Sequence, residues 1–177
     1  MATDTMGKWM RLSVVVTLRV TDSAIRGNPM LQFNGERELA VPPQEVWEKL
    51  RDARFLVTCV PDLQSVSKAE QDLAVCRIRP AFSFVTGSQE LTIHVVEAVP
   101  HTLIRLEQIT KGIGTSVTVE STMQFIPVAV GTRLSWSAQV TKLGGLLKAL
   151  PEGLLRGAAE KVITDAWTAV LNKLQQG

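Results

Sequence analysis

The sequence predicts an α+β domain in which a curved antiparallel sheet of about seven strands packs against one long C-terminal helix. Two patterns carry this prediction. Apolar and polar residues alternate from about Leu63 to Leu143, as in a sheet with one solvent-facing side. From Leu155 to Leu174 the apolar residues recur with the period of a helix. Because each apolar face must be buried, packing the helix against the sheet is the simplest arrangement.

Length and composition fit one such domain. With 177 residues and 19.4 kDa the chain can enclose a core and a pocket, whereas two compact domains would be cramped. Hydrophobic residues make up 45% and charged residues 20%, which argues against a disordered or fibrous chain. A net charge of +2 is too small for a nucleic-acid footprint, so no nucleic-acid partner is expected. Two cysteines, Cys59 and Cys76, cannot form a disulfide framework, and no metal or cofactor is predicted.

Residues 1–29 are predicted to form an extension outside the main domain at 30–177. Alternating apolar residues over 12–20 predict an added edge strand, and Arg19 interrupts the apolar run that a secretory signal would need. Turn-forming residues over 21–29 then predict a linker. Since an edge strand is a template for pairing, a homodimer through this strand is a further expectation. No apolar run is long enough to cross a membrane, and a cytoplasmic location is expected.

Each element of the domain has its own local signal. Alternation over residues 31–41 predicts a strand that ends at Pro42-Pro43, and the apolar spacing after these prolines predicts a short helix up to Arg51. A second short helix is expected over 55–60. Later strands are predicted over 65–68, 73–79, 84–99, 103–110, 116–126 and 132–143.

The final helix carries many small residues on the side expected to face the sheet. They imply either close contact between helix and sheet or a space for a ligand, and we favour the ligand. These small residues are Gly153, Gly157, Ala158, Ala159 and Ala166. The preceding leucine-rich segment, 143–155, is broken by Pro151. It is expected to be a lid over the pocket or a surface for a partner or membrane, with a core-facing helix start as the alternative.

The residues expected to line the pocket share the inner face of the strands or of the helix. Most are apolar, and Cys76, Ser121 and Arg105 are polar groups that can orient one end of a guest, unless Arg105 faces solvent. For any one residue, plain core packing is the simpler interpretation. The predicted ligand-binding residues are Cys76, Phe84, Leu91, Ile93, Val95, Leu106, Val119, Ser121, Met123, Phe125, Leu134, Trp136, Ala138, Leu154, Ala158 and Val162.

No catalytic residue is predicted. His94 and His101 fall on an outward strand position and in a turn, where a solvated histidine is the simpler interpretation. Glu97, which shares the apolar parity of its strand, and Glu107 have no visible partner for acid–base chemistry. The sequence holds no nucleophile, metalloprotease, phosphate-loop or dinucleotide motif. It therefore favours a binding protein over an enzyme without excluding an enzyme.

Five short strings, taken in their order and spacing, resemble one family. They are Phe33-Asn34-Gly35, Pro43-Gln44-Glu45-Val46-Trp47, Cys59-Val60-Pro61, Gly131-Thr132-Arg133-Leu134-Ser135-Trp136 and Gly144-Gly145-Leu146-Leu147. From about Met30 to Leu174 the chain is thus similar to the carbon monoxide dehydrogenase G-subunit family of the START and birch-pollen-allergen (SRPBCC) superfamily. In that helix-grip fold a curved sheet wraps a C-terminal helix and leaves a cavity. Asp62 and Arg79 depart from the family pattern, which has glycine at both positions.

The resemblance implies a function as well as a fold. It implies binding of a small hydrophobic molecule, lipid- or quinone-like, by an accessory protein for assembly, maturation or membrane recruitment of a carbon monoxide dehydrogenase-type molybdenum hydroxylase. Because the chain ends at Gly177 after its helix, any membrane contact is expected to be peripheral, at the inner face. Two alternatives stay open: a polyketide cyclase- or dehydratase-like enzyme, which needs a polar group in the cavity, and a protein-interaction module with a filled core and no ligand.

Overall fold

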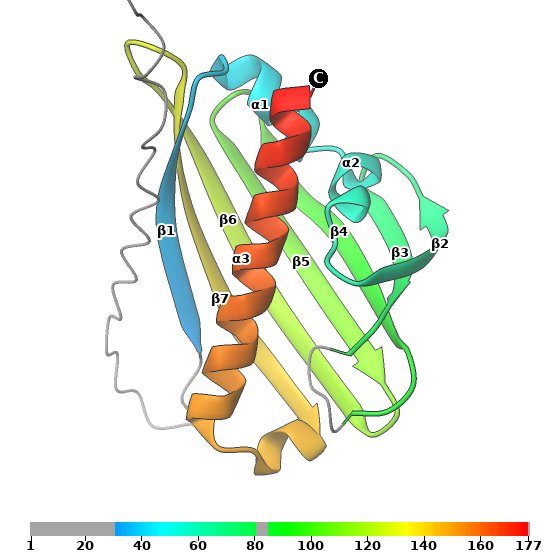
Figure 1. Cartoon of the computed structure of the whole chain (residues 1–177). Coiled ribbons are helices and arrows are strands. Elements are labelled where there is room, and N and C mark those ends of the chain that lie inside the picture. The colour runs from blue at the N-terminus through cyan, green and yellow to red at the C-terminus, as the bar shows by residue number, and fades with distance from the viewer. Residues whose placement is uncertain (1–30, 81–84, 177) are drawn as a thin grey trace, which may run out of the picture.

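A seven-stranded antiparallel sheet and a long C-terminal helix make up most of the structure (Figure 1). The structure is a computed structural model, and it describes residues 31–80 and 85–176. The predicted edge strand over 12–20, and with it the expected pairing with a second copy, lies outside the described residues. Phe84, one of the predicted ligand-binding residues, also lies outside them.

The elements follow the order that the sequence predicts. They are β1 (Gln32–Leu39), α1 (Pro43–Leu50), α2 (Ala53–Thr58), β2 (Leu63–Ala69), β3 (Leu73–Ile78), β4 (Gln89–Val99), β5 (Leu103–Gly112), β6 (Thr115–Pro127), β7 (Thr132–Gly145), the 3-10 helix η1 (Leu146–Ala149) and α3 (Glu152–Gln176). The strand order β1-β7-β6-β5-β4-β3-β2 is antiparallel throughout, and β1 pairs with the last strand. The predicted α+β fold is confirmed.

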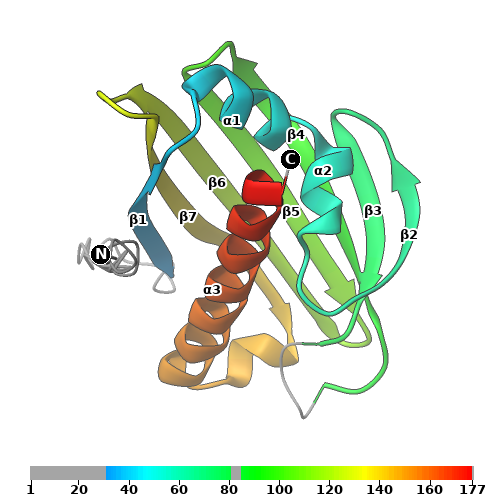
Figure 2. The same ribbon diagram turned by 45° about the horizontal axis from the view of Figure 1, so that its top comes forward.

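The sheet curves around α3, which crosses its concave face (Figure 2). α1 and α2 cover the end of the sheet where α3 finishes, and α1 begins with proline in its first turn, where no amide donor is needed. The carboxylate of Asp52 caps α2 by accepting a hydrogen bond from the backbone N–H of Arg54 at 2.9 Å. Buried residues of both helices, among them Val46 and Val57, join the core beneath them.

Bulges interrupt the alternation of the sheet. One lies between Val95 and Glu97 in β4, and another lies between Val140 and Lys142 in β7, opposite Val119 and Thr118 of β6. The extra residue in β4 turns Glu97 outward, where its carboxylate pairs with Arg105 at 3.2 Å in an exposed ion pair. The prediction that Glu97 lies on the apolar face of its strand was therefore wrong. Arg105 lies on the outer face of the sheet.

α3 is anchored mainly by its C-terminal half. Its fully buried residues are Val170 and Leu174, whereas its N-terminal turns are only partly covered. Gly153 and Gly157 are exposed, and a Cβ atom added at either would meet nothing within 4 Å. The prediction that these two glycines face the sheet was wrong, because they lie on the solvent side of the helix.

We expect Gly153→Ala and Gly157→Ala each to raise the free energy of unfolding by about 0.5–1 kcal/mol. Alanine restricts the unfolded chain and favours the helix, and the structure leaves room for its methyl group at both positions. Urea denaturation of each variant measures the change. Gly35→Ala is the matched control: its Cβ would lie 2.9 Å from Cζ2 of Trp136, so it should destabilise. Unchanged or lower stability in both helix variants would contradict this account of α3.

Candidate ligand-binding cavity

A cavity of about 360 Å³ lies between the sheet and α3. Inner-face residues of β4, β5, β6 and β7 form its floor, and one side of α3 forms its roof. The end of α2 and the segment 59–62 form a side wall, and Leu147 of η1 contributes to the lining. Its volume falls within the range of small-molecule sites in proteins.

Most of the residues that the sequence predicted to bind a ligand line this cavity. Strand alternation explains the sheet residues, because every second side chain of an uninterrupted strand faces the same side. The helical period explains the residues of α3. Their contact with a ligand stays a prediction. The lining residues are Leu91, Ile93, Leu106, Val119, Ser121, Met123, Trp136, Ala138, Ala158 and Val162.

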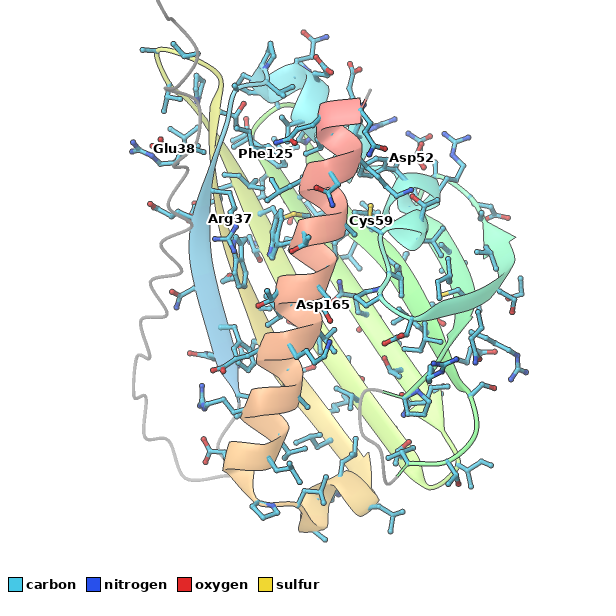
Figure 3. The ribbon with its side chains drawn as sticks, viewed as in Figure 1. Arg37, Glu38, Asp52, Cys59, Phe125 and Asp165 are labelled. Atoms are coloured by element: carbon cyan, nitrogen blue, oxygen red, sulfur yellow. The ribbon has the colours of Figure 1, made fainter. Side chains whose placement is uncertain are left out.

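The other predicted residues lie elsewhere. Cys76, Val95, Phe125 and Leu134 are buried in the core but do not line the cavity. α1 packs on β5 and β6, and α2 packs on β3 and β4, so residues of these strands also face helices other than α3. Figure 3 shows Phe125 toward the end of the sheet where α1 lies. Leu154 is 47% exposed, on the outside of α3.

Several lining residues were not named as ligand-binding from the sequence. Gln108 and Thr110 share the parity of Leu106 on β5, so alternation was a signal that could have found them. Trp167 lies on the inner stripe of α3 and was likewise detectable by its period. The segment Val60–Asp62 carries no periodic signal, and only the departure from the family pattern at Asp62 pointed to it.

The rim of the cavity carries charge. Asp62 and Arg79 both line it and are exposed, and the backbone N–H of Arg79 donates to the carbonyl of Asp62 at 3.0 Å. Asp62 has a φ of 54°, in the left-handed region that few non-glycine residues adopt. Lys161 of α3 forms an ion pair with Asp165, which is the main cause of the raised pKa of Lys161, and the charge of Asp62 adds to this rise. Asp62 and Arg79, the two departures from the family pattern, thus lie in contact with each other at the rim of the cavity.

An indole pair forms the wall between β7 and α3. The rings of Trp136 and Trp167 lie 5.7 Å apart, and Gly35 of β1 leaves the space that the Trp136 ring occupies. Arg37, on β1 beside α3 in Figure 3, places its guanidinium carbon 6.0 Å from the centre of the Trp167 ring. Burial lowers the pKa of Arg37, which stays charged at neutral pH. Within the described residues, Nε of Arg37 and Nε1 of Trp136 are buried without a hydrogen-bond partner.

The floor of the cavity holds polar side chains among the apolar ones. On β6 the hydroxyl of Ser121 donates to Oε1 of Gln108 on β5 at 3.3 Å. Gln89, at the start of β4, is buried, and its Nε2 donates to Oγ1 of Thr115 at 3.2 Å. Both glutamines line the same cavity. The lining can therefore offer hydrogen bonds as well as apolar contact.

The ionisable groups of the lining give little support for chemistry. Among the described residues, the ionisable groups that line the cavity are Asp62 and Arg79 at the rim and the buried Cys59, whose place between α2 and α3 Figure 3 shows. Burial raises the pKa of the Cys59 thiol, although Thr58 and Lys173 partly offset this. In residues 31–80 and 85–176 no group of three His, Cys, Asp or Glu side chains is placed to hold a metal ion.

Both histidines lie outside the cavity. His94 is exposed on the outer face of β4, and His101 is exposed in the turn before β5. The ring of His101 contacts Trp47 edge-on, with 5.4 Å between the ring centres. The expectation that the histidines are solvated agrees with this placement.

The sheet, the gripped helix and the cavity define a START-like, helix-grip protein, and solved structures share this fold. A conserved protein of Geobacillus kaustophilus has a TM-score of 0.71 at 24% identity, covering 82% of this chain and 96% of that chain. A protein of Chromobacterium violaceum has a TM-score of 0.59 at 15% identity, covering 81% of this chain and 96% of that chain. A START superfamily protein of Mycobacterium smegmatis has a TM-score of 0.57 at 9% identity, covering 83% of this chain and 97% of that chain. At these identities the likeness concerns the fold alone.

The sequence places the chain within this class. Residues 35–175 match the carbon monoxide dehydrogenase G-subunit (CoxG) family, and the chain belongs to that family. The resemblance predicted from the five strings is confirmed. A comparison with curated proteins finds no match. In the described ranges, no helix is long and apolar enough to cross a membrane.

We expect Cys59 to react slowly with iodoacetamide, with a half-maximal rate at a higher pH than that of free glutathione. Burial favours the neutral thiol, so the reactive thiolate forms only as the pH rises through the raised pKa. Alkylation of a Cys76→Ala variant, followed by mass spectrometry from pH 7 to pH 10, measures this. A half-maximal rate at or below that of glutathione would contradict the buried placement.

Proposed function

We propose that the protein binds a small hydrophobic molecule in the cavity between the sheet and α3. The observation that carries this proposal is the cavity itself, whose wall is mostly apolar and drawn from every strand except β2. A filled core would leave no such space, which weighs against an interaction module without a ligand. Membership of the CoxG family supports the same proposal.

The lining favours binding over catalysis. A cyclase- or dehydratase-like enzyme would need a polar group poised for proton transfer inside the cavity. The rim groups Asp62 and Arg79 are exposed, and the raised pKa of Cys59 keeps that thiol neutral. The hydrogen-bonding side chains of the floor are amides and hydroxyls, which can orient a guest but have no acid–base role near neutral pH.

η1 and the start of α3 supply a lid for this cavity. Leu147 is fully buried and lines the cavity, whereas Leu146 beside it faces solvent. The N-terminal half of α3 covers the cavity with partly buried residues, whereas the buried residues of this helix, Val170 and Leu174, lie in its C-terminal half. Ala158 and Val162 of this half lie in the roof, so a guest would enter by displacing these turns of the helix.

We expect Ala158→Trp to weaken the binding of N-phenyl-1-naphthylamine, a neutral apolar dye, by at least about tenfold. The indole would occupy the space under α3 that the small side chain leaves open. Fluorescence titration measures the affinity, and a thermal melt verifies that the variant folds. Gly157→Trp is the matched control, because it adds the same bulk to the exposed side of the helix. Equal dye binding in a folded Ala158→Trp variant would refute the placement of the site.

Native mass spectrometry of protein from its own cells, followed by organic extraction, tests the proposal without choosing a probe. A retained lipid- or quinone-like molecule would identify the natural guest. Protein that emerges empty, and that also fails to bind the dye, would overturn the proposal.

The setting we propose is that of an accessory protein for a carbon monoxide dehydrogenase-type molybdenum hydroxylase, with peripheral contact at the inner membrane face. Family membership supports the first part. The second is supported by two exposed apolar side chains at one end of the sheet, Ile113 at 81% and Leu146 at 65%. They are neighbours, because the amide of Leu146 donates to Gly114 at 2.8 Å, and the exposed Lys111 and Lys148 flank them.

We expect the double variant Ile113→Ser with Leu146→Ser to bind anionic vesicles of phosphatidylglycerol and phosphatidylethanolamine about tenfold more weakly than the native chain. Sedimentation with vesicles measures the bound fraction. Val130→Ser is the control, because Val130 is 79% exposed in the turn at the opposite end of the sheet. No vesicle binding by the native chain, or equal loss in the control, would contradict the proposed surface.

A further inference from the structure

Two glutamines line the same cavity but differ in what their amide groups have available. Nε2 of Gln89 uses one of its two N–H donors on the hydroxyl of Thr115 at 3.2 Å. In Gln108 the carbonyl oxygen is committed instead, because it accepts the hydroxyl of Ser121 at 3.3 Å. Within the described residues, Nε2 of Gln108 has no hydrogen-bond partner. Gln108 therefore brings two free N–H donors to the lining.

The position of Gln108 makes this difference significant. It lies on β5 between Leu106 and Thr110 on the inner face, and all three line the cavity. Ser121 lies diagonally across on β6, since Gln108 pairs with Val119, two residues away from Ser121. Its hydroxyl holds the amide in one orientation with the carbonyl turned toward β6. A polar group held in this way in an apolar wall fixes the orientation of a guest.

The chemistry of the donor defines the guest. An amide N–H in an apolar surrounding is satisfied by an acceptor oxygen, and leaving such a group unpaired on ligand binding costs free energy. The ionisable groups of the described lining lie at the rim, at Asp62 and Arg79, or are the neutral thiol of Cys59. A carboxylate or phosphate on the floor would thus be buried without a lining cation beside it. A neutral acceptor avoids that cost.

We propose that Gln108, oriented by Ser121, is a hydrogen-bonding residue of the cavity and selects apolar guests that carry a neutral carbonyl oxygen over hydrocarbons of the same shape. This inference rests on the proposed function and names the class of ligand that the cavity takes. Gln108 is the binding residue and Ser121 the positioning residue, because the serine acts through the amide that it holds.

The test uses two probes of nearly equal shape, 2-acetonaphthone and 2-ethylnaphthalene, which differ by a carbonyl group in place of a methylene. Each displaces N-phenyl-1-naphthylamine from the full-length chain, and the ratio of their affinities is the measured quantity. We expect the ketone to bind about two- to tenfold more tightly, the range of one net hydrogen bond. The infrared band of the bound carbonyl should lie at lower frequency than in an alkane solvent.

Gln108→Met keeps the length of the side chain and removes the amide, so the ketone preference and the infrared shift should both be lost while 2-ethylnaphthalene binds as before. Gln89→Met is the matched control. It removes the other glutamine of the lining, whose amide is tied to Thr115 through one of its two N–H donors, and should lower stability but leave the preference unchanged. Ser121→Ala should reduce the preference without removing the dye site, because the amide stays but loses its orientation. Thermal melts establish that each variant folds.

The outcomes separate the two levels of the proposal. A preference that is lost in Gln108→Met and kept in Gln89→Met supports it. Equal binding of the two probes by the native chain, or a preference that survives Gln108→Met, overturns the role of Gln108 but leaves the hydrophobic cavity intact. If the dye and both probes fail to bind, the proposed function fails first, and this inference fails with it.

Discussion

The concave apolar face of the sheet has to be covered, and a single helix covers most of it. α3 meets this requirement with its last turns, where Val170 and Leu174 are buried in the common core. Nearer the start of α3, the side chains of small residues such as Ala158 and Ala159 are too short to fill the space above the curved sheet. The cavity is the space between the curved sheet and α3, which packs closely against the sheet only at its C-terminal end. Lid, rim and floor are all arranged around that space.

Other parts of the fold hold this geometry in place. β1 pairs with β7, so the first and last strands of the sheet are neighbours. Gly35 on β1 leaves room for the Trp136 ring close to the strand, and Trp167 of α3 lies against that ring. The hydroxyl of Thr132 donates to the carbonyl of Val41 at 2.6 Å and fixes the chain as it leaves β1. The position of α3 therefore depends on a contact between residues that are far apart in the sequence.

The sequence was a good guide wherever one repeating period decided the direction of a side chain. Strand alternation placed Leu91 and Ile93 on the cavity floor, because β4 is regular there. It failed at Glu97, because an inserted residue reverses the parity and nothing local in the sequence marks a bulge. Small residue size alone misplaced Gly157, because size does not say which side of a helix a residue occupies. Val60 was missed, because loop residues are placed by tertiary packing.

The backbone at Asp62 restricts how the rim can vary. A left-handed φ of 54° is tolerated by glycine and, at small cost, by asparagine and aspartate, whose short side chains can hydrogen-bond locally. Longer or branched side chains would strain the turn between α2 and β2. Variation at this position should thus favour glycine, asparagine, aspartate and histidine, and His101 of this chain adopts a similar φ of 56°. Lysine and arginine would strain this turn, so the backbone disfavours a permanent positive charge at this point of the rim.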